Sequence, residues 1–448
     1  MDKFVLEEIA LGDRQGLSIF VHVPWYLWYF DKDFKAYRNN WRTPLKGELL
    51  GSKILGITGL LTPEHPYHNY AEVSHWIARS NKRLLGRISA SVTDRKLNFK
   101  SQFNTAKIGF FGFFDSVNNQ RVANALLKVA EEWLRQRGCS IMMGPGGYSN
   151  ATHEPYQGVL VSGFDSPPSV ELTYNPPFYS TLLESYGLVK AKDYVTYDFS
   201  VDVFLRSGLR ASKATDVSEL EEKVNRTLER ITKKEREIGI EIRTLNIAKL
   251  RDEIKLIVSI YNEAWKHNWG FTEITEPEAE IMADSLRQLA DSNLILFGYH
   301  NSEPVAVFGG IPDPYAVLKP NFELQVLLKY LRNSDIGRVL TGILLPRIAN
   351  RRSSPSPHVR VMFFGIKDQQ RKKLIATSMM YRLMSYAFMA RYETADASLL
   401  LEDNRDVISL CQHYSGRLSK TYRIYYKPIA LQAYTNKPAL QEKSVAAL

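Results

Sequence analysis

The sequence predicts an α+β fold with two similar halves, each a mixed, mostly antiparallel twisted sheet flanked by helices. One observation is an order of patterns that occurs twice: two paired strands, a third strand, an amphipathic helix, a fourth strand and a short helix. The other is a motif that closes each half. Asn175 precedes Gly187 by 12 residues, Asn404 precedes Gly416 by 12 residues, and Lys-x-Tyr-x-x-Tyr follows both glycines. Such internal similarity indicates one structural unit used twice.

The elements of the first half follow from alternating and helical periodicity. Its predicted strands are 76–79, 85–92, 107–114 and 140–143, with a turn at 80–82. Between the last two strands, apolar residues recur with helical spacing at Val122, Leu126, Val129 and Trp133. This helix is predicted to end at Gly138.

The second half repeats these elements after a charged segment. Its predicted strands are 294–299, 304–310, 359–366 and 397–401, and its helix places Ala376, Met380, Leu383 and Ala387 on one face. Segment 217–238 is predicted to be a connecting helix. We therefore expect a first domain at 1–200, a helical connector at 201–238, a second domain at 239–430 and a tail at 431–448.

Two further segments carry specific structural predictions. Each closing motif is interpreted as a short helix that ends at its glycine, followed by a tyrosine-rich β-hairpin. The aromatic segment 18–30 is interrupted by His22 and Pro24 and is predicted to be a packed loop, with an aromatic patch at a membrane surface as the alternative.

Composition limits the class of protein. The 448 residues contain only two cysteines, far apart at Cys139 and Cys411, which provide neither a disulfide framework nor metal-ligand spacing. The pair His65 and His68 lacks further ligands, so no metal site is predicted. The start lacks a secretory signal, and no apolar run is long enough to cross a bilayer. We expect a cytoplasmic protein without an integral membrane segment.

Positive charge is concentrated in segment 331–391. This segment contains twelve basic residues and two acidic ones, a difference equal to the net charge of +10 of the whole chain. It forms either a solvated basic face or a binding surface, in a groove between the domains, for phosphates of a cofactor, a carrier or an RNA. Arg371, Lys372 and Lys373 are its central candidates.

The order of elements resembles the GNAT acyltransferase fold. In that family a Gln/Arg-x-x-Gly-x-Gly/Ala loop opens the central helix and holds the pyrophosphate of coenzyme A on free backbone N–H groups. The corresponding segments are Gln120-Arg121-Val122-Ala123-Asn124-Ala125 and Arg371-Lys372-Lys373-Leu374-Ile375-Ala376. Ala123 and Leu374 replace the central glycine, and their side chains would crowd a pyrophosphate that lies against the backbone.

The whole chain is similar to a bacterial family of tandem-GNAT proteins. The similarity rests on several segments together: 109–114, 144–145, 163–168, 174–179, 261–265, 268–271, 401–404 and 420–425. It implies an acyltransferase that uses an acyl-CoA or acyl carrier protein as co-substrate, with no tightly bound cofactor, and a small amine as acceptor. One member of this broad group has been linked to ceramide synthesis, which implies long acyl chains. The similarity to Fem-type enzymes implies an alternative function, that of an aminoacyl-tRNA-dependent transferase. A third hypothesis is a binding module in which one half is catalytically inactive.

Amine acylation requires a base, donors for the carbonyl oxygen and an acid for the leaving group. The base is predicted at Glu154, or at His153 oriented by it, in a glycine-rich insertion of the first half, which is predicted to be the catalytic half. The resemblance implicates the backbone near Phe113 and Phe114 for the oxygen and Tyr179 as acid.

The remaining candidates are predicted to contact the acceptor, the acyl group or RNA. Trp265, Asn268 and Trp269 line a pocket or belong to the core. The others are Asn150, Tyr156, Asn175 and the three basic residues of segment 371–373.

Overall fold

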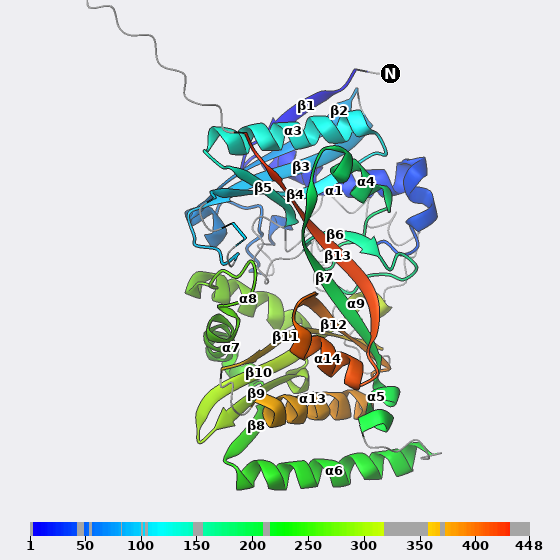
Figure 1. Cartoon of the computed structure of the whole chain (residues 1–448), viewed down its shortest axis with the longest axis vertical. Coiled ribbons are helices and arrows are strands. Elements are labelled where there is room, and N and C mark those ends of the chain that lie inside the picture. Colours follow the sequence, from blue (N-terminus) through cyan, green and yellow to red (C-terminus); the bar gives the residue numbers. More distant parts are fainter. Residues whose placement is uncertain are drawn as a thin grey trace, which may run out of the picture.

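The computed structural model describes residues 3–42, 49–52, 56–81, 83–99, 102–103, 106–146, 156–208, 216–317, 357–367 and 372–430. It confirms the predicted α+β class. In the described part, thirteen strands form one mixed sheet that runs through two stacked lobes (Figure 1). The order along the sheet is β1-β2-β3-β4-β5-β13-β7-β12-β11-β10-β9-β8, with β6 beside β13.

The first lobe contains the elements predicted for the first half. Its strands are β1 (Val5–Ile9), β2 (Ala71–Ser80), β3 (Arg83–Thr93), β4 (Ile108–Ser116), β5 (Ile141–Gly146) and β6 (Val159–Ser162). Its helices are α1 (Arg14–Phe30), α3 (Gln120–Gln136) and α4 (Phe178–Ser185), with short 3-10 turns η1 (Lys32–Tyr37) and η3 (Pro66–Asn69).

The second lobe follows the same plan. Its strands are β8 (Ile240–Thr244), β9 (Ile295–His300), β10 (Glu303–Pro312), β11 (His358–Ile366) and β12 (Thr394–Leu401). Its helices are α5 (Val201–Gly208), α6 (Val217–Glu237), α7 (Leu250–Trp265), α8 (Glu276–Leu289), α9 (Pro314–Val317), α13 (Lys372–Met389) and α14 (Arg405–His413), with η4 (Ile247–Lys249) and η5 (Ser292–Leu294). Helix α13 covers one face of this sheet and α7 the other.

The closing motifs do not form hairpins, so that prediction was wrong. Each is one long strand, β7 (Val189–Ser200) or β13 (Arg417–Pro428), and the two pair with each other antiparallel from Arg417↔Asp198 to Tyr426↔Val189. Each strand also crosses into the other lobe: β7 pairs with β12, and β13 pairs with β5 (Figure 1). A local pattern predicts a strand but not its partner, which lies more than 200 residues away. The domain limits therefore stay predictions.

Two other elements differ in place or type from expectation. Segment 18–30 lies in helix α1 and not in a loop, because Phe20, Val23 and Leu27 are fully buried on one face and outweigh the break caused by Pro24. The connecting helix α6 packs on α13 and β8 at the outer end of the second lobe, and not between the lobes (Figure 1).

The two repeated asparagines stand before equivalent helices but differ in their contacts. Asn175 is buried, accepts a hydrogen bond from the Leu160 N–H at 2.8 Å, and donates to the carbonyls of Leu160 and Pro176. Asn404 caps α14 and accepts from the Val407 N–H at 3.4 Å.

We predict that Asn175→Ala destabilises the protein more than the matched change Asn404→Ala. The first change leaves buried backbone groups of Leu160 without partners, which costs about 1–3 kcal/mol each. Loss of a helix cap costs about 1 kcal/mol. Urea unfolding measures both free energies, and equal losses would contradict this account of the repeat.

Candidate functional site

The second lobe contains an opening between two parallel strands. β11 and β12 pair from His358↔Thr394 to Val361↔Ala397, and both continue for several residues without pairing to each other. The register of β12 against β7 also shifts between Ala397 and Leu400. The strands therefore separate beyond Val361 and Ala397.

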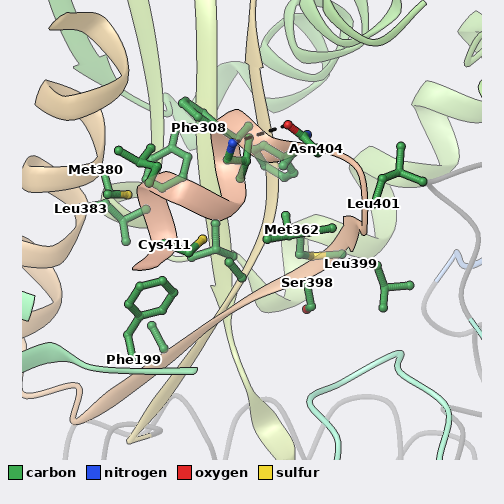
Figure 2. A pocket seen from close by; sticks show the side chains of 18 of the residues that line it. Phe199, Phe308, Met362, Met380, Leu383, Ser398, Leu399, Leu401, Asn404 and Cys411 are labelled. Carbon is green, nitrogen blue, oxygen red and sulfur yellow. Dashed lines mark hydrogen bonds between the residues drawn. The ribbon is translucent and has the colours of Figure 1, made fainter. Parts of the chain in front are cut away.

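An apolar pocket occupies this opening (Figure 2). Phe308, Met380 and Leu383 reach it from the core on the α13 face, whereas Trp265 and Phe363 belong to the core on the α7 face. The pocket therefore extends between the two strands from one face of the sheet to the other. Its other lining residues include Tyr194, Phe199, Phe204, Val361, Met362, Met384, Ala395, Ala397, Leu399, Leu401, Val407, Leu410 and Cys411.

The size and lining of the pocket suit a thin apolar chain. Its cavity volume is about 90 Å³, which is less than the ~150 Å³ of a cavity that takes up benzene. Met362, Met380 and Met384 line it, and methionine side chains adapt their shape more readily than branched ones. The lining therefore suits an apolar chain, and the cavity itself has room for only a small part of one.

Polar groups gather where the same two strands begin. Alternation along β12 puts Ala395 and Ala397 toward the pocket and Asp396 on the opposite face of the sheet. Asp396 is only 2% exposed, and its Oδ1 lies 2.7 Å from Nε2 of His358 and 2.6 Å from the Ser169 hydroxyl. Nδ1 of His358 lies 2.8 Å from the Thr394 hydroxyl.

Arg360 links these polar groups to the pocket. Its Nη1 pairs with Glu171 at 2.9 Å and donates to the carbonyl of Val170, and its Nε donates to the Ser398 hydroxyl at 3.2 Å. Ser398 itself lines the pocket, and in Figure 2 its side chain points away from Phe308 and Met380. The polar groups therefore adjoin the closed end of the opening.

Electrostatics separates the proton affinities of these groups. Burial alone would lower the pKa of His358, but the hydrogen bond that its ring donates to Asp396 and the charges of Asp396, Asp313 and Asp198 raise it. Burial alone would raise the pKa of Asp396, but His358 and Arg360 lower it. Burial raises the pKa of Asp313 to about 6, and burial also raises the pKa of Asp198. Ionisable groups tuned apart in this way are typical of functional sites.

The corresponding strands of the first lobe stay together. β4 and β5 are paired from Ile108↔Ile141 to Phe110↔Met143, their register then shifts, and they pair once more at Gly112↔Gly146, the last residue of β5. Phe113, with a φ of 47°, and Phe114 are both 6% exposed, and the Phe113 ring contacts Phe20. The side chains of both residues thus belong to the core, and the role predicted for their backbone stays a prediction.

The start of α3 is already capped. The Asn119 side chain accepts from the Arg121 N–H, and the Asn119 carbonyl accepts from the N–H groups of Val122 and Ala123. Ala123 is fully buried and Ala125 half-buried, and Gln120 donates to the Leu182 carbonyl. The predicted pyrophosphate site of this lobe therefore has several of its backbone donors engaged within the protein.

The first-lobe candidates differ in their distance from the polar groups of the second lobe. Tyr156 adjoins them, because its N–H donates at 3.2 Å to the carbonyl of Glu171, the partner of Arg360. Tyr179 is buried and donates to Asp115 at 3.1 Å, and burial holds its pKa well above the ordinary value. Tyr156 contacts Phe113, and Asn175 holds β6. Asn150, His153 and Glu154 lie outside the described residues, so the predicted base and the predicted catalytic half stay predictions.

Two of the three predicted pocket residues of the second lobe line the pocket. Trp265, which donates to the Phe364 carbonyl, and Asn268 contribute to its wall. Trp269 instead packs against Phe99 and donates to Gln102.

The predicted basic surface is only partly described. Arg371 and the side chains of Lys372 and Lys373 lie outside the described residues. Four basic residues of segment 331–391 have described side chains, and each is paired with a carboxylate: Arg360 with Glu171, Lys367 with Glu263, Arg382 with Glu235 and Arg391 with Glu221. These four therefore add little net charge to a surface for phosphates.

Sequence reasoning missed His358, Asp396, Asp313 and Ser169. A signal was present, because Asp396 stands among apolar residues just before the predicted strand 397–401, and a charged residue in a buried strand needs a partner. The identity of the partners was not readable, because Ser169 and His358 are separated by 189 residues.

The fold, with its opening between two parallel strands, is of the type found in GNAT acyltransferases. Residues 49–151 match the acetyltransferase (GNAT) family. A tandem GNAT protein from the clavulanic acid biosynthesis pathway has the same fold, with a TM-score of 0.51 and 9% identity, over 96% of this chain and 99% of that one.

Two curated proteins are similar over most of the chain. The chain is 28% identical over 396 residues to the bacterial ceramide synthase of Caulobacter vibrioides. The aligned region covers 87% of this chain and 91% of that protein. The chain is 25% identical over 376 residues to protein YghO of Escherichia coli, over 82% and 85% of the two chains. Residues 49–151 thus match the GNAT family, and the chain has the fold of a tandem GNAT protein.

Within the ranges given above, no cluster of three or more His, Cys, Asp or Glu side chains is arranged to bind a metal ion. None of the described helices combines the length and the apolar character that a bilayer crossing requires.

We predict that His358→Gln destabilises the protein more at pH 6 than at pH 9. Folding raises the pKa of His358. Protonated His358 therefore stabilises the folded protein fully at a pH below the pKa of the unfolded chain, about 6.5, and this contribution is lost as the pH rises through the pKa of the folded protein. Thermal melting across this range measures the difference. The exposed His413→Gln is the control, and a pH-independent loss for His358→Gln would contradict the charged pair with Asp396.

Proposed function

We propose that the protein moves an acyl group from a thioester, an acyl-CoA or an acyl carrier protein, to the amine of a small acceptor and forms an amide. The observation that carries this proposal is the apolar pocket between the separated ends of β11 and β12. A pocket that extends through the sheet holds the acyl chain in an apolar space and brings its carbonyl carbon to the polar groups at the start of the strands.

The geometry supports the individual steps of acyl transfer. Beyond Val361, β11 has no partner on β12, so backbone N–H groups at this edge are suitable donors for the carbonyl oxygen of the thioester. The amine nitrogen forms a bond to the carbonyl carbon, the carbon–sulfur bond breaks, and the thiolate leaves. The acceptor must first lose a proton, which requires a base near the opening.

The curated relative supports an acceptor and a product of a particular class. The relative from Caulobacter vibrioides is a ceramide synthase, and a ceramide is the fatty amide of a long-chain amino alcohol. The lining of the pocket agrees with a fatty acyl chain. We therefore propose a long-chain amine as acceptor, a fatty acyl thioester as donor and action in the cytoplasm.

The direct test compares donors. The purified protein is incubated with sphinganine and, separately, with palmitoyl-CoA, palmitoyl acyl carrier protein or bulk charged tRNA, and amides are detected by mass spectrometry. Amide from either thioester supports the proposal. Product from charged tRNA alone would replace it with the aminoacyl-tRNA-dependent alternative.

We predict that Ala397→Leu shifts the donor preference toward shorter acyl chains. Ala397 lines the pocket, and three added carbons occupy space that the end of a long chain needs. One methylene in such a pocket changes discrimination about 10-fold or more. The kcat/KM values for octanoyl and palmitoyl thioesters measure the shift. Ala191→Leu on β7, away from the pocket, is the control, and an unchanged ratio for Ala397→Leu would place the chain elsewhere.

We also predict that Glu154→Gln keeps near wild-type turnover. The pocket lies in the second lobe, whereas Glu154 belongs to the insertion of the first half that the sequence favoured as catalytic. Loss of a general base lowers the rate about 100-fold or more. Steady-state turnover with a thioester donor measures the effect, and a loss of that size would return the chemistry to the first lobe.

A further inference from the structure

We propose that the polar cluster on the face of β12 opposite the α13 core is the binding site for the protonated amine of the acceptor. In this site Asp396 binds the ammonium group and Asp313 receives its proton. The inference rests on the proposed function and adds to it the place and the residues of acceptor recognition in the second lobe.

The first argument is an unused acceptor atom. Oδ1 of Asp396 is engaged by His358 and Ser169, but Oδ2 is buried and has no hydrogen-bond partner. A buried carboxylate oxygen without a donor is costly. A substrate ammonium group supplies such a donor and adds a charge-assisted hydrogen bond.

The second argument is that the cluster is built from both halves of the chain. The first half contributes segment 163–173, whose Ser169 contacts Asp396 and whose Val170 N–H donates to Asp313 at 3.3 Å. The segment is fixed by Lys420 of β13, whose ammonium group donates to the carbonyls of Gly163 and Ser166 at 2.7 and 2.8 Å. The loop is therefore held in place before any substrate binds.

The third argument is the position relative to the acyl pocket. Asp396 lies one residue from the pocket residues Ala395 and Ala397, on the other side of the same strand. Ser398 lines the pocket and accepts from Arg360, which belongs to the cluster. An amine held at Asp396 thus adjoins the closed end of the opening through which a thioester carbonyl would arrive.

Asp313 is suited to receive the proton. It is 3% exposed, and its carboxylate accepts from the backbone N–H groups of Tyr315 and Val170. The charged groups near it are His358 on β11, Asp396 on β12 and Arg42 after η1. Burial raises the pKa of Asp313 to about 6, which lets it accept a proton near neutral pH and release it again.

The proton balance of the step is complete. The ammonium group transfers one proton to the carboxylate of Asp313, and the neutral amine attacks the thioester carbon. When the carbon–sulfur bond breaks, the second proton lost by nitrogen goes to the leaving thiolate and produces a free thiol. Protonated Asp313 then releases its proton to solvent, and no oxidant or further reactant is needed.

The test of recognition uses a matched pair of ligands without any acyl donor. Calorimetry measures the binding of dodecylamine and of 1-dodecanol, which share the chain but differ in the charged group. We expect Asp396→Asn to weaken the binding of dodecylamine about tenfold to a hundredfold and to leave that of dodecanol unchanged. Asp202→Asn, an exposed carboxylate of α5, is the control. Equal affinity of Asp396→Asn and wild type for dodecylamine would overturn the site.

The test of proton transfer uses Asp313→Asn and is independent of the first variant. We expect kcat to fall about 100-fold with little change in KM for the amine, and the rise of kcat with pH near 6 to disappear. Thermal melting checks the folding of every variant. An unchanged kcat and pH profile would overturn the role of Asp313.

The two proposals fail in different ways. If the wild type forms no amide from any thioester but Asp396→Asn loses affinity for dodecylamine, the proposed function fails and the amine site stands. If the wild type forms amide and Asp396→Asn keeps both the affinity and the KM for the amine, the amine site fails and the proposed function stands.

Discussion

The pairing of β7 with β13 is the interaction on which the rest of the structure depends. These two strands belong to different halves of the chain, pair antiparallel over most of their length, and each also pairs with a strand of the opposite lobe. The two lobes therefore share one sheet and do not merely touch. The exchange also brings Lys420 of β13 to segment 163–173, which reaches the polar cluster of the second lobe.

The two lobes use the same order of elements for different purposes. β4 and β5 pair again after a shift in register, up to Gly112 of β4 and the end of β5, and Phe113 and Phe114 lie in a packed core. β11 and β12 separate after four residue pairs and leave a pocket. Close packing at one pair of parallel strands stabilises the protein, whereas the gap at the other gives up dispersion contacts and creates space for a ligand. The two lobes therefore differ in how their central parallel strands are packed.

The sheet also separates two environments that acyl transfer needs side by side. Apolar side chains from both faces of the sheet, those of α13 and α14 among them, surround the pocket, and His358, Asp396 and Asp313 lie at the start of the strands. A fatty chain is stable in the first environment, and a charged amine requires the second. In the proposed reaction, the separation of β11 from β12 lets the two meet.

The sequence by itself determined the elements that depend on neighbours along the chain. The periodicity of α3 and α13, the strands before and after them and the repeat of Asn175 and Asn404 were predictable because side-chain spacing along a helix or strand is local. Tertiary structure alone decided the partners of β7 and β13, the separation of β11 from β12 and the meeting of Ser169 with Asp396. These depend on contacts between residues far apart in the chain, which local periodicity does not encode.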